Sequence, residues 1–239
     1  GGMVYTIDND TLKRVDRSFD HNMQYGTAFF EHDHTIFKYG GYGFWSDRDF
    51  FTYYDKQRGE WEVYHPLKSD AIPEGRSFLE FIKNKNLFHI FGGKRVNPEN
   101  RREQLDTNEA WTFDFKTNKW HFLGKHDKIE PFLKSIPFKN KLALVRKNAV
   151  TVIDVESNTK TVHKHSPVSG LTNGILYAAH AGDQFYMLII DHNGTYLNIV
   201  KEEDFFGEVA EQTKFYKNQA YWLNWSAIYL LGMSLIILS

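Results

Sequence analysis

Two pairs of histidines at alternate positions are candidates for metal binding in this sequence. Glu31-His32-Asp33-His34 and His163-Lys164-His165 each place two imidazoles two residues apart, which puts both on one face of an extended strand. Imidazoles in that arrangement can bind zinc or copper. Neither pair has an obvious third ligand, so both are better interpreted as solvated histidines at strand ends. We expect no metal and no cofactor.

Other catalytic patterns are also missing from the sequence. The chain has no Cys, which excludes disulfides, thiolate metal sites and a Cys nucleophile. It has no Gly-rich phosphate loop ahead of a helix and no Ser nucleophile elbow, and its carboxylates form no paired motif. The net charge is −1 without a basic stripe, which argues against nucleic acid as a partner. The sequence therefore nominates no catalytic residue.

The elements that must position any site are recurring aromatic strands. Aromatic residues make up 16% of the chain, a composition that favours pleated sheets. Two stretches, 35–64 and 87–123, share a strand ending in Gly-Gly, a second strand ending in Asp, and a Trp six positions beyond that Asp across a polar turn. The repeated residues are Gly40, Gly41, Asp55 and Trp61 in the first stretch and Gly92, Gly93, Asp114 and Trp120 in the second. Each stretch therefore predicts a β-hairpin between its Asp and its Trp.

Fainter copies of the pattern extend it in both directions. Residues 142–163 keep the strand spacing and Asp154 but lack the Gly pair and the Trp, and residues 185–200 match by strand pattern alone. Residues 5–15 look like the last two strands of an earlier unit. About four and a half units are therefore visible.

This pattern resembles the kelch repeat, including Pro73-Glu74-Gly75-Arg76-Ser77 where kelch repeats often carry a Pro-x-x-Arg turn. The resemblance covers roughly residues 3 to 207 and implies four-stranded blades arranged as a β-propeller. We therefore expect an all-β, kelch-type β-propeller over 1–207, N-terminally incomplete, followed by a polar linker over 208–220. Blades bury apolar walls against each other, so the repeated Gly, Asp and Trp residues are interpreted as structural.

Two enzyme classes built on propellers are disfavoured by particular residues. Galactose-oxidase-like copper enzymes need a Cys cross-linked to Tyr. This chain has no Cys, so the resemblance does not extend to their copper-radical residues. Asp191-His192-Asn193-Gly194-Thr195-Tyr196 is similar to the turn motif of sialidase-type propellers, but its Gly is displaced and it occurs once. A hairpin turn made by Asn-Gly explains that segment better.

The resemblance also implies where a ligand would bind. In kelch propellers the loops after the Gly pair and the connections between blades emerge on one face around the central channel. Here these segments carry a set of aromatic and Arg residues: Phe44, Trp45, Arg48, Arg76, Arg95, Arg101 and Arg102. Arg and Trp are enriched at binding hot spots, so this face suits an acidic peptide or a sugar. The alternative is that the loop over 94–109 is a solvated charged insertion.

An apolar segment follows the repeats. Tyr221 to Leu238 has 18 residues without a charge, and aromatic residues gather at its start. Roughly 17–25 apolar residues span a bilayer, so we predict a transmembrane helix over 221–239, with a buried C-terminal strand or helix as the alternative. Acidic residues ahead of the segment favour an extracytoplasmic propeller. The competing topology is a cytoplasmic propeller with a C-terminal tail anchor.

These features together predict a function. We expect a membrane-anchored kelch propeller that binds a protein, peptide or carbohydrate ligand as a sensor or receptor, without catalysis. The alternative is a carbohydrate-active propeller enzyme, a sugar isomerase or hydrolase, with part of its site outside this sequence. A purely structural interaction scaffold is a third hypothesis.

Overall fold

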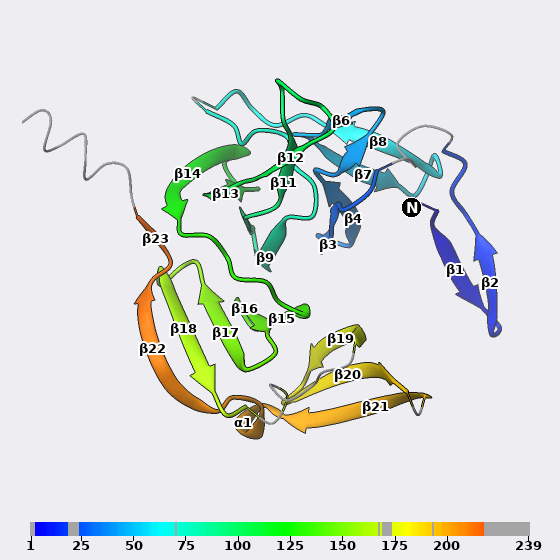
Figure 1. Ribbon diagram of the computed structural model, residues 1–239. Coiled ribbons are helices and arrows are strands. Elements are labelled where there is room, and N and C mark those ends of the chain that lie inside the picture. The colour runs from blue at the N-terminus through cyan, green and yellow to red at the C-terminus, as the bar shows by residue number, and fades with distance from the viewer. Residues whose placement is uncertain are drawn as a thin grey trace, which may run out of the picture.

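The aromatic repeats fold into small antiparallel sheets set side by side like the blades of a propeller (Figure 1). The computed structural model describes residues 3–18, 24–69, 71–166, 168, 174–192 and 194–217. Over these residues the fold is all-β with four blades, which confirms the predicted all-β propeller arrangement.

The two strong repeats form the first two blades. In each, the strand ending in Gly-Gly is the second strand of the sheet, and the Asp and Trp lie on the two strands of the outer hairpin. Blade 1 consists of β3 (Ala28–His32), β4 (Thr35–Tyr39), β7 (Phe51–Asp55) and β8 (Glu60–Tyr64). Blade 2 consists of β9 (Glu80–Asn84), β10 (Leu87–Phe91), β13 (Glu109–Asp114) and β14 (Lys119–His126).

The two weak repeats form the other blades. Blade 3 consists of β15 (Lys134–Phe138), β16 (Lys141–Val145), β17 (Ala149–Asp154) and β18 (Thr159–Lys164). Blade 4 has three strands, β19 (Gly174–Ala181), β20 (Gln184–Asp191) and β21 (Gly194–Lys201). The strand spacing was therefore sufficient to locate a blade even where the Gly pair and the Trp are missing.

The repeated Asp accepts hydrogen bonds from backbone amides in the turn of the outer hairpin. Asp55 Oδ1 accepts a hydrogen bond from the backbone N–H of Gln57 at 2.8 Å, and Asp114 Oδ1 accepts one from Lys116 at the same distance. Asp154 Oδ1 accepts from the N–H of Ser157 at 3.0 Å. A carboxylate that satisfies turn amides stabilises the reversal of the chain, and this local role persists in blade 3.

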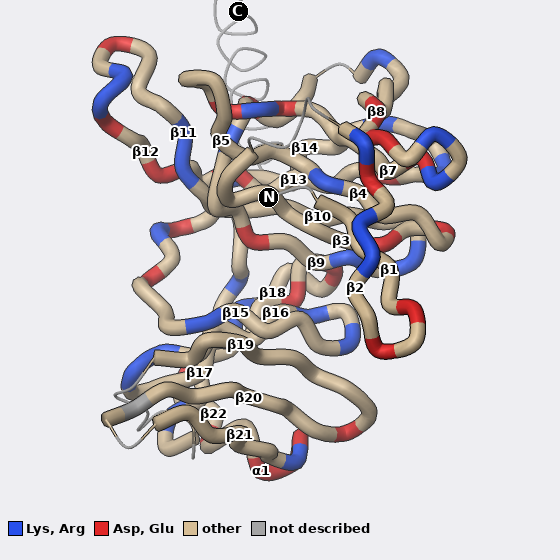
Figure 2. Tube along the Cα trace, turned by 90° about the vertical axis from the view of Figure 1, so that its right-hand side faces the viewer, with Lys and Arg blue, Asp and Glu red and all other residues tan. Residues whose placement is uncertain are grey.

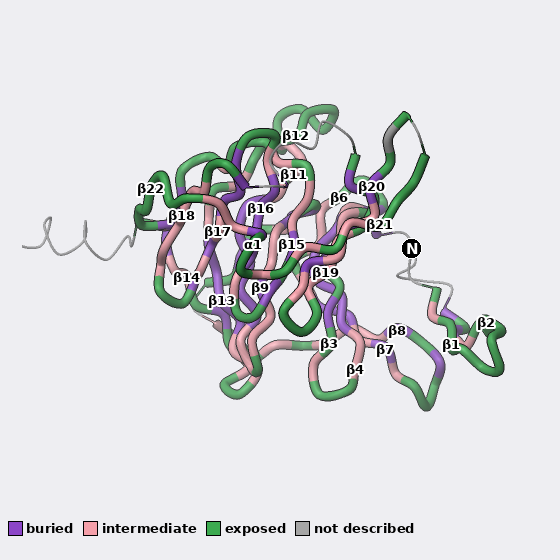
Figure 3. The backbone as a smooth tube through the Cα atoms, turned by 90° about the horizontal axis from the view of Figure 1, so that it is seen from below, coloured by how far each residue is buried: buried purple, intermediate pink, exposed green. Residues whose placement is uncertain are grey.

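Three apolar clusters hold the blades together. Between blades 1 and 2 the cluster is mainly aromatic, and Trp120 packs there against Phe51 and Tyr39. Aliphatic residues dominate the clusters between blades 2 and 3 and between blades 3 and 4. Figure 3 shows the buried residues running through the middle strands of the blades. Burial of apolar surface between sheets therefore stabilises the arrangement.

The C-terminal part of the described chain returns along the outside of the blades. After α1 (Glu202–Phe205), β22 (Glu208–Lys214) pairs with β18 of blade 3, and β23 (Tyr216–Lys217) pairs with β14 of blade 2 (Figure 1). We call β22 and β23 the strap. Residues 208–217 were assigned to a polar linker from composition, whereas they form strands, because an exposed edge strand needs no apolar residues to pair through its backbone.

The N-terminal hairpin stands apart from the four blades. β1 (Tyr5–Asp8) and β2 (Thr11–Arg14) form a sheet of two strands in which every residue is exposed (Figure 1). The segment that follows joins blade 1, where the N–H of Arg17 donates to Gly59 O at 2.6 Å and the N–H of Trp61 donates to Ser18 Oγ at 2.7 Å.

The predicted transmembrane segment over 221–239 lies outside the described residues. Within the described ranges no helix has both the length and the apolar character needed to cross a bilayer.

Candidate functional site

Each Gly pair in blades 1 and 2 is followed by a short inserted hairpin, and the two hairpins are neighbours. They are β5 (Tyr42–Gly43) with β6 (Ser46–Asp47), and β11 (Lys94–Val96) with β12 (Gln104–Asp106). β6 contacts β11, and the N–H of Val96 donates a hydrogen bond to the Asp47 carboxylate. The two hairpins therefore lie side by side, and we call the surface that they form the hairpin face (Figure 1).

Glycine is required where these hairpins leave the blades. Gly40 has φ +69°, and a Cβ built there would lie 2.6 Å from the Arg76 carbonyl oxygen. Gly93 has φ +92°, and its Cβ would lie 2.8 Å from the Ser77 carbonyl oxygen. Any side chain would collide with the backbone of the connection between blades 1 and 2, so the Gly pair fixes the hairpins against that connection.

Phe44 and Trp45 form the tip of the β5–β6 hairpin. Their exposed fractions are 70% and 80%, although both side chains are large and apolar. Their φ angles are +51° and +64°, so both residues are in the left-handed region, as a two-residue type I′ turn requires. Asn and Gly normally fill such turns, because the left-handed conformation costs other residues about 1–2 kcal/mol each. Both side chains therefore contribute little buried apolar surface to the fold.

The Arg residues predicted for this face differ in their surroundings. The Arg48 guanidinium lies 5.7 Å from the Phe50 ring centroid, and Arg95 forms an ion pair with Glu74. Arg101 and Arg102 are exposed in the connection between β11 and β12. Figure 2 shows cationic and acidic residues alternating along this hairpin. The hairpin face therefore offers mixed charges beside an aromatic tip.

Arg76, also predicted for the face, is fully buried. Its guanidinium donates hydrogen bonds to Thr107 Oγ1 at 3.3 Å, to the Glu109 carbonyl oxygen at 3.4 Å and to Glu109 Oε2 at 3.3 Å. Burial lowers the pKa of Arg76, while Tyr39 and Glu109 oppose that shift. Arg76 thus joins the connection between blades 1 and 2 to β13, and it offers no donor at the surface.

The two members of each histidine pair differ in their burial and contacts. The His32 ring lies 4.0 Å from the Phe115 ring and its side chain is 11% exposed, whereas the His34 side chain is 99% exposed. His163 Nδ1 lies 3.1 Å from the Gly207 carbonyl oxygen, and the side chain of His165 is 81% exposed. No group of three His, Asp or Glu side chains that could share a metal ion occurs in the described part of the chain.

A cavity that sequence reasoning missed lies beside the hairpin face. It has a volume of about 630 Å³ and is bounded by Gly92 and Gly93, by Glu80 on β9, by His126 on β14 and by the connection 128–132. Burial raises the pKa of Glu80 to about 7, although Ser135 and Lys134 favour its charged form. Burial lowers the pKa of His126. No sequence signal marks Glu80, because its environment is built by residues from blades 2 and 3.

No protein-family model and no curated protein matches this chain.

Proposed function

We propose that this chain is a kelch-type propeller, anchored in a membrane, that binds a protein or peptide through its hairpin face. The observation that carries the proposal is the exposed Phe44–Trp45 tip. Two aromatic residues held in a left-handed turn cost stability, and they expose a large apolar surface. Trp and Arg are the residue types that dominate binding hot spots, and Arg48, Arg101 and Arg102 are carried by the same pair of hairpins.

The chemistry of the face favours an acidic peptide with an apolar side chain. The rings of Phe44 and Trp45 suit an apolar side chain, and the exposed guanidinium groups of Arg101 and Arg102 suit carboxylates. Kelch identity is supported by the Gly pairs and by the Asp-to-Trp spacing in blades 1 and 2. Anchoring is supported by the uncharged run from Tyr221 to Leu238, and the acidic residues ahead of it favour an extracytoplasmic propeller.

The binding proposal is tested with an immobilised peptide library in which every member carries one aromatic or aliphatic anchor, flanked either by Asp and Glu or by Ser and Gly. We expect saturable binding to acidic members. Trp45→Ala should weaken it about 30-fold, as a hot-spot residue worth about 2 kcal/mol does. Tyr177→Ala is the matched control, because Tyr177 is 65% exposed on blade 4. Equal losses in both variants, or no binding to any member, would contradict the proposal.

Membrane anchoring has a separate test. The full chain and a chain truncated after Lys217 are expressed with the same tag, and membranes are washed with carbonate. We expect the full chain in the membrane pellet and the truncated chain in the supernatant. A full chain that washes off would remove the anchor from the proposal without affecting peptide binding.

A second candidate function, a carbohydrate-active enzyme, is favoured by one observation. A carboxyl group with a pKa of about 7 in a cavity can act as a general acid or base near neutral pH, and Glu80 is such a group. Hydrolysis of chromogenic glycosides that is lost in Glu80→Gln would support this candidate. Activity unchanged in Glu80→Gln would exclude Glu80 from the reaction.

A further inference from the structure

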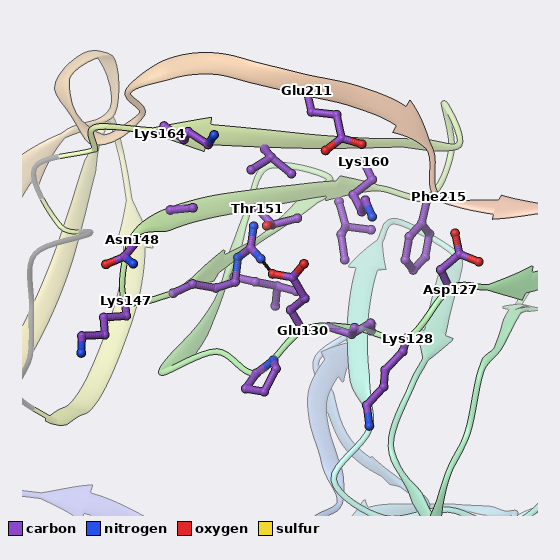
Figure 4. A pocket seen from close by; sticks show the side chains of 17 residues that line it. Asp127, Lys128, Glu130, Lys147, Asn148, Thr151, Lys160, Lys164, Glu211 and Phe215 are labelled. Atoms are coloured by element: carbon purple, nitrogen blue, oxygen red, sulfur yellow. Dashed lines mark ion pairs between the residues drawn. The ribbon is translucent and has the colours of Figure 1, made fainter.

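A second cavity, of about 630 Å³, lies against blade 3 and shares the connection that follows β14 with the first cavity (Figure 4). Its wall comes from that connection, from β16, β17 and β18 of blade 3, and from the strap. A cavity of this size can hold a small organic molecule.

The repeat explains why a cavity exists here. Trp61 and Trp120 stand six positions after Asp55 and Asp114, and the corresponding position after Asp154 is Lys160. Trp120 is 5% exposed and fills the gap between blades 1 and 2, with its ring 5.6 Å from that of Phe51 and 5.2 Å from that of Phe113. Lys160 supplies a thin, charged side chain at the same position, so the outer part of the next gap is left open.

Phe215 of the strap replaces the missing Trp only in part. It is 5% exposed and belongs to the apolar cluster that closes the inner part of the gap. Leu144, Ile153 and Val162 continue this apolar wall into the cavity. The cavity therefore has an apolar floor and a charged rim.

The rim carries cations whose charges are not all paired. Lys160, Val162 and Lys164 lie at every second position of β18. Residues two apart in a strand lie on the same face, so all three side chains line the cavity. Within the residues that the structure describes, neither ammonium group has a carboxylate within ion-pair distance. Lys160 is half-buried, whereas Lys164 is exposed.

Arg146 adds a buried donor without an acceptor. Its Nη1 pairs with Glu130, while its Nε is buried and has no hydrogen-bond partner among the described residues. Glu211 of β22 also lines the cavity, opposite Val162 in the strand register (Figure 4). Taken together, the lining side chains carry two more positive than negative charges, in a chain whose net charge is −1.

We propose that this cavity binds a small organic molecule that carries a phosphate group. A phosphate would accept hydrogen bonds from Lys160, Lys164 and Arg146 Nε and would offset the excess of two positive charges, while the apolar floor would hold the organic part. The site is separate from the hairpin face, so it does not depend on the proposed peptide binding.

The test is isothermal titration of the full chain with glycerol phosphate and with inorganic phosphate, at constant ionic strength set with potassium chloride. We expect saturable binding of both, tighter for glycerol phosphate. Lys160→Gln should weaken it at least about tenfold, as loss of a charged hydrogen bond of 1.5–3 kcal/mol does. Lys119→Gln, an exposed Lys on β14 outside the cavity, is the matched control and should bind as the wild type.

Lys160→Trp provides an independent test, since it introduces the residue that blades 1 and 2 carry at this position. It should fill the gap and abolish phosphate binding while the circular dichroism spectrum stays that of a β fold. If Lys160→Trp does not fold, Lys160→Gln still decides the question. Absence of phosphate binding, equal binding by Lys160→Gln and Lys119→Gln, or stronger binding of succinate than of either phosphate would overturn the proposal.

Discussion

The imidazole of His126 stacks on the ring of Phe215, with centroids 5.1 Å apart and planes inclined by 12°. His126 ends β14 of blade 2, whereas Phe215 lies between the two strands of the strap. This contact brings the strap into the interior between blades 2 and 3, where Phe91 also meets Phe215 at 4.9 Å. The strap is thus part of the core as well as an edge strand.

Phe215→Ala should therefore lower the free energy of unfolding by about 3–5 kcal/mol, the usual cost of deleting a buried aromatic side chain. Val209→Ala on β22 is the control, because Val209 is 63% exposed and should change stability by less than about 0.5 kcal/mol. Urea unfolding followed by Trp fluorescence measures both. A similar small loss in the two variants would mean that the strap does not stabilise the blades.

The contribution of His126 and His89 to stability should fall as the pH drops below about 6.5, the ordinary pKa of His. His126 Nε2 accepts a hydrogen bond from the N–H of Gly92 at 3.2 Å, and its Nδ1 lies 2.8 Å from the Asp127 carbonyl oxygen, so these contacts select the neutral ring. Burial lowers the pKa of His126 and of His89. Below pH 6.5 these two histidines then bind more protons in the unfolded chain than in the folded chain, which favours unfolding, whereas the raised pKa of Glu80 acts in the opposite direction below about pH 7.

Melting temperatures between pH 8 and pH 5 test this sign. His126→Phe keeps an aromatic ring beside Phe215 but cannot be protonated, so its melting temperature should decline less steeply with acid than that of the wild type. A variant curve parallel to that of the wild type would exclude His126 as a source of the pH dependence.

Arg76→Met should destabilise the fold by about 3 kcal/mol, because it removes the buried partner of a charged contact. Thr107 Oγ1 then loses the Arg76 donor, and Glu109 keeps the Trp111 indole N–H but loses its countercharge. The double variant Arg76→Met/Glu109→Gln should recover part of the loss, since the uncompensated carboxylate is gone. Chemical denaturation of the two variants and the wild type measures this. A double variant less stable than the single variant would contradict the pairing.

Replacing Phe44-Trp45 with Asn-Gly should stabilise the hairpin tip by about 1–2 kcal/mol, because these residues adopt the type I′ turn without strain. The same variant should lose the peptide binding proposed for the hairpin face. Thermal unfolding and the peptide library measure the two effects. Loss of stability would show that the aromatic pair serves the fold.

The sequence by itself determined the features that depend on near neighbours. The Asp of each outer hairpin satisfies amides two or three residues away, so the turns after Asp55, Asp114 and Asp154 could be placed from spacing alone. Alternating apolar residues likewise located all four blades, including the two that lack the Gly pair, because a strand needs one buried face wherever it packs.

Only the tertiary structure decided which side chains meet across blades. Arg76 carries the charge of a surface residue, but Thr107 and Glu109, more than thirty positions away, accept its hydrogen bonds and bury it. The amino-acid composition did not predict the strands of the strap, since these strands pair through their backbones along β18 and β14. Lys160 marks a cavity only because the gap that a Trp fills elsewhere lies in front of it. Such contacts depend on how far apart the sheets stand, which no local pattern encodes.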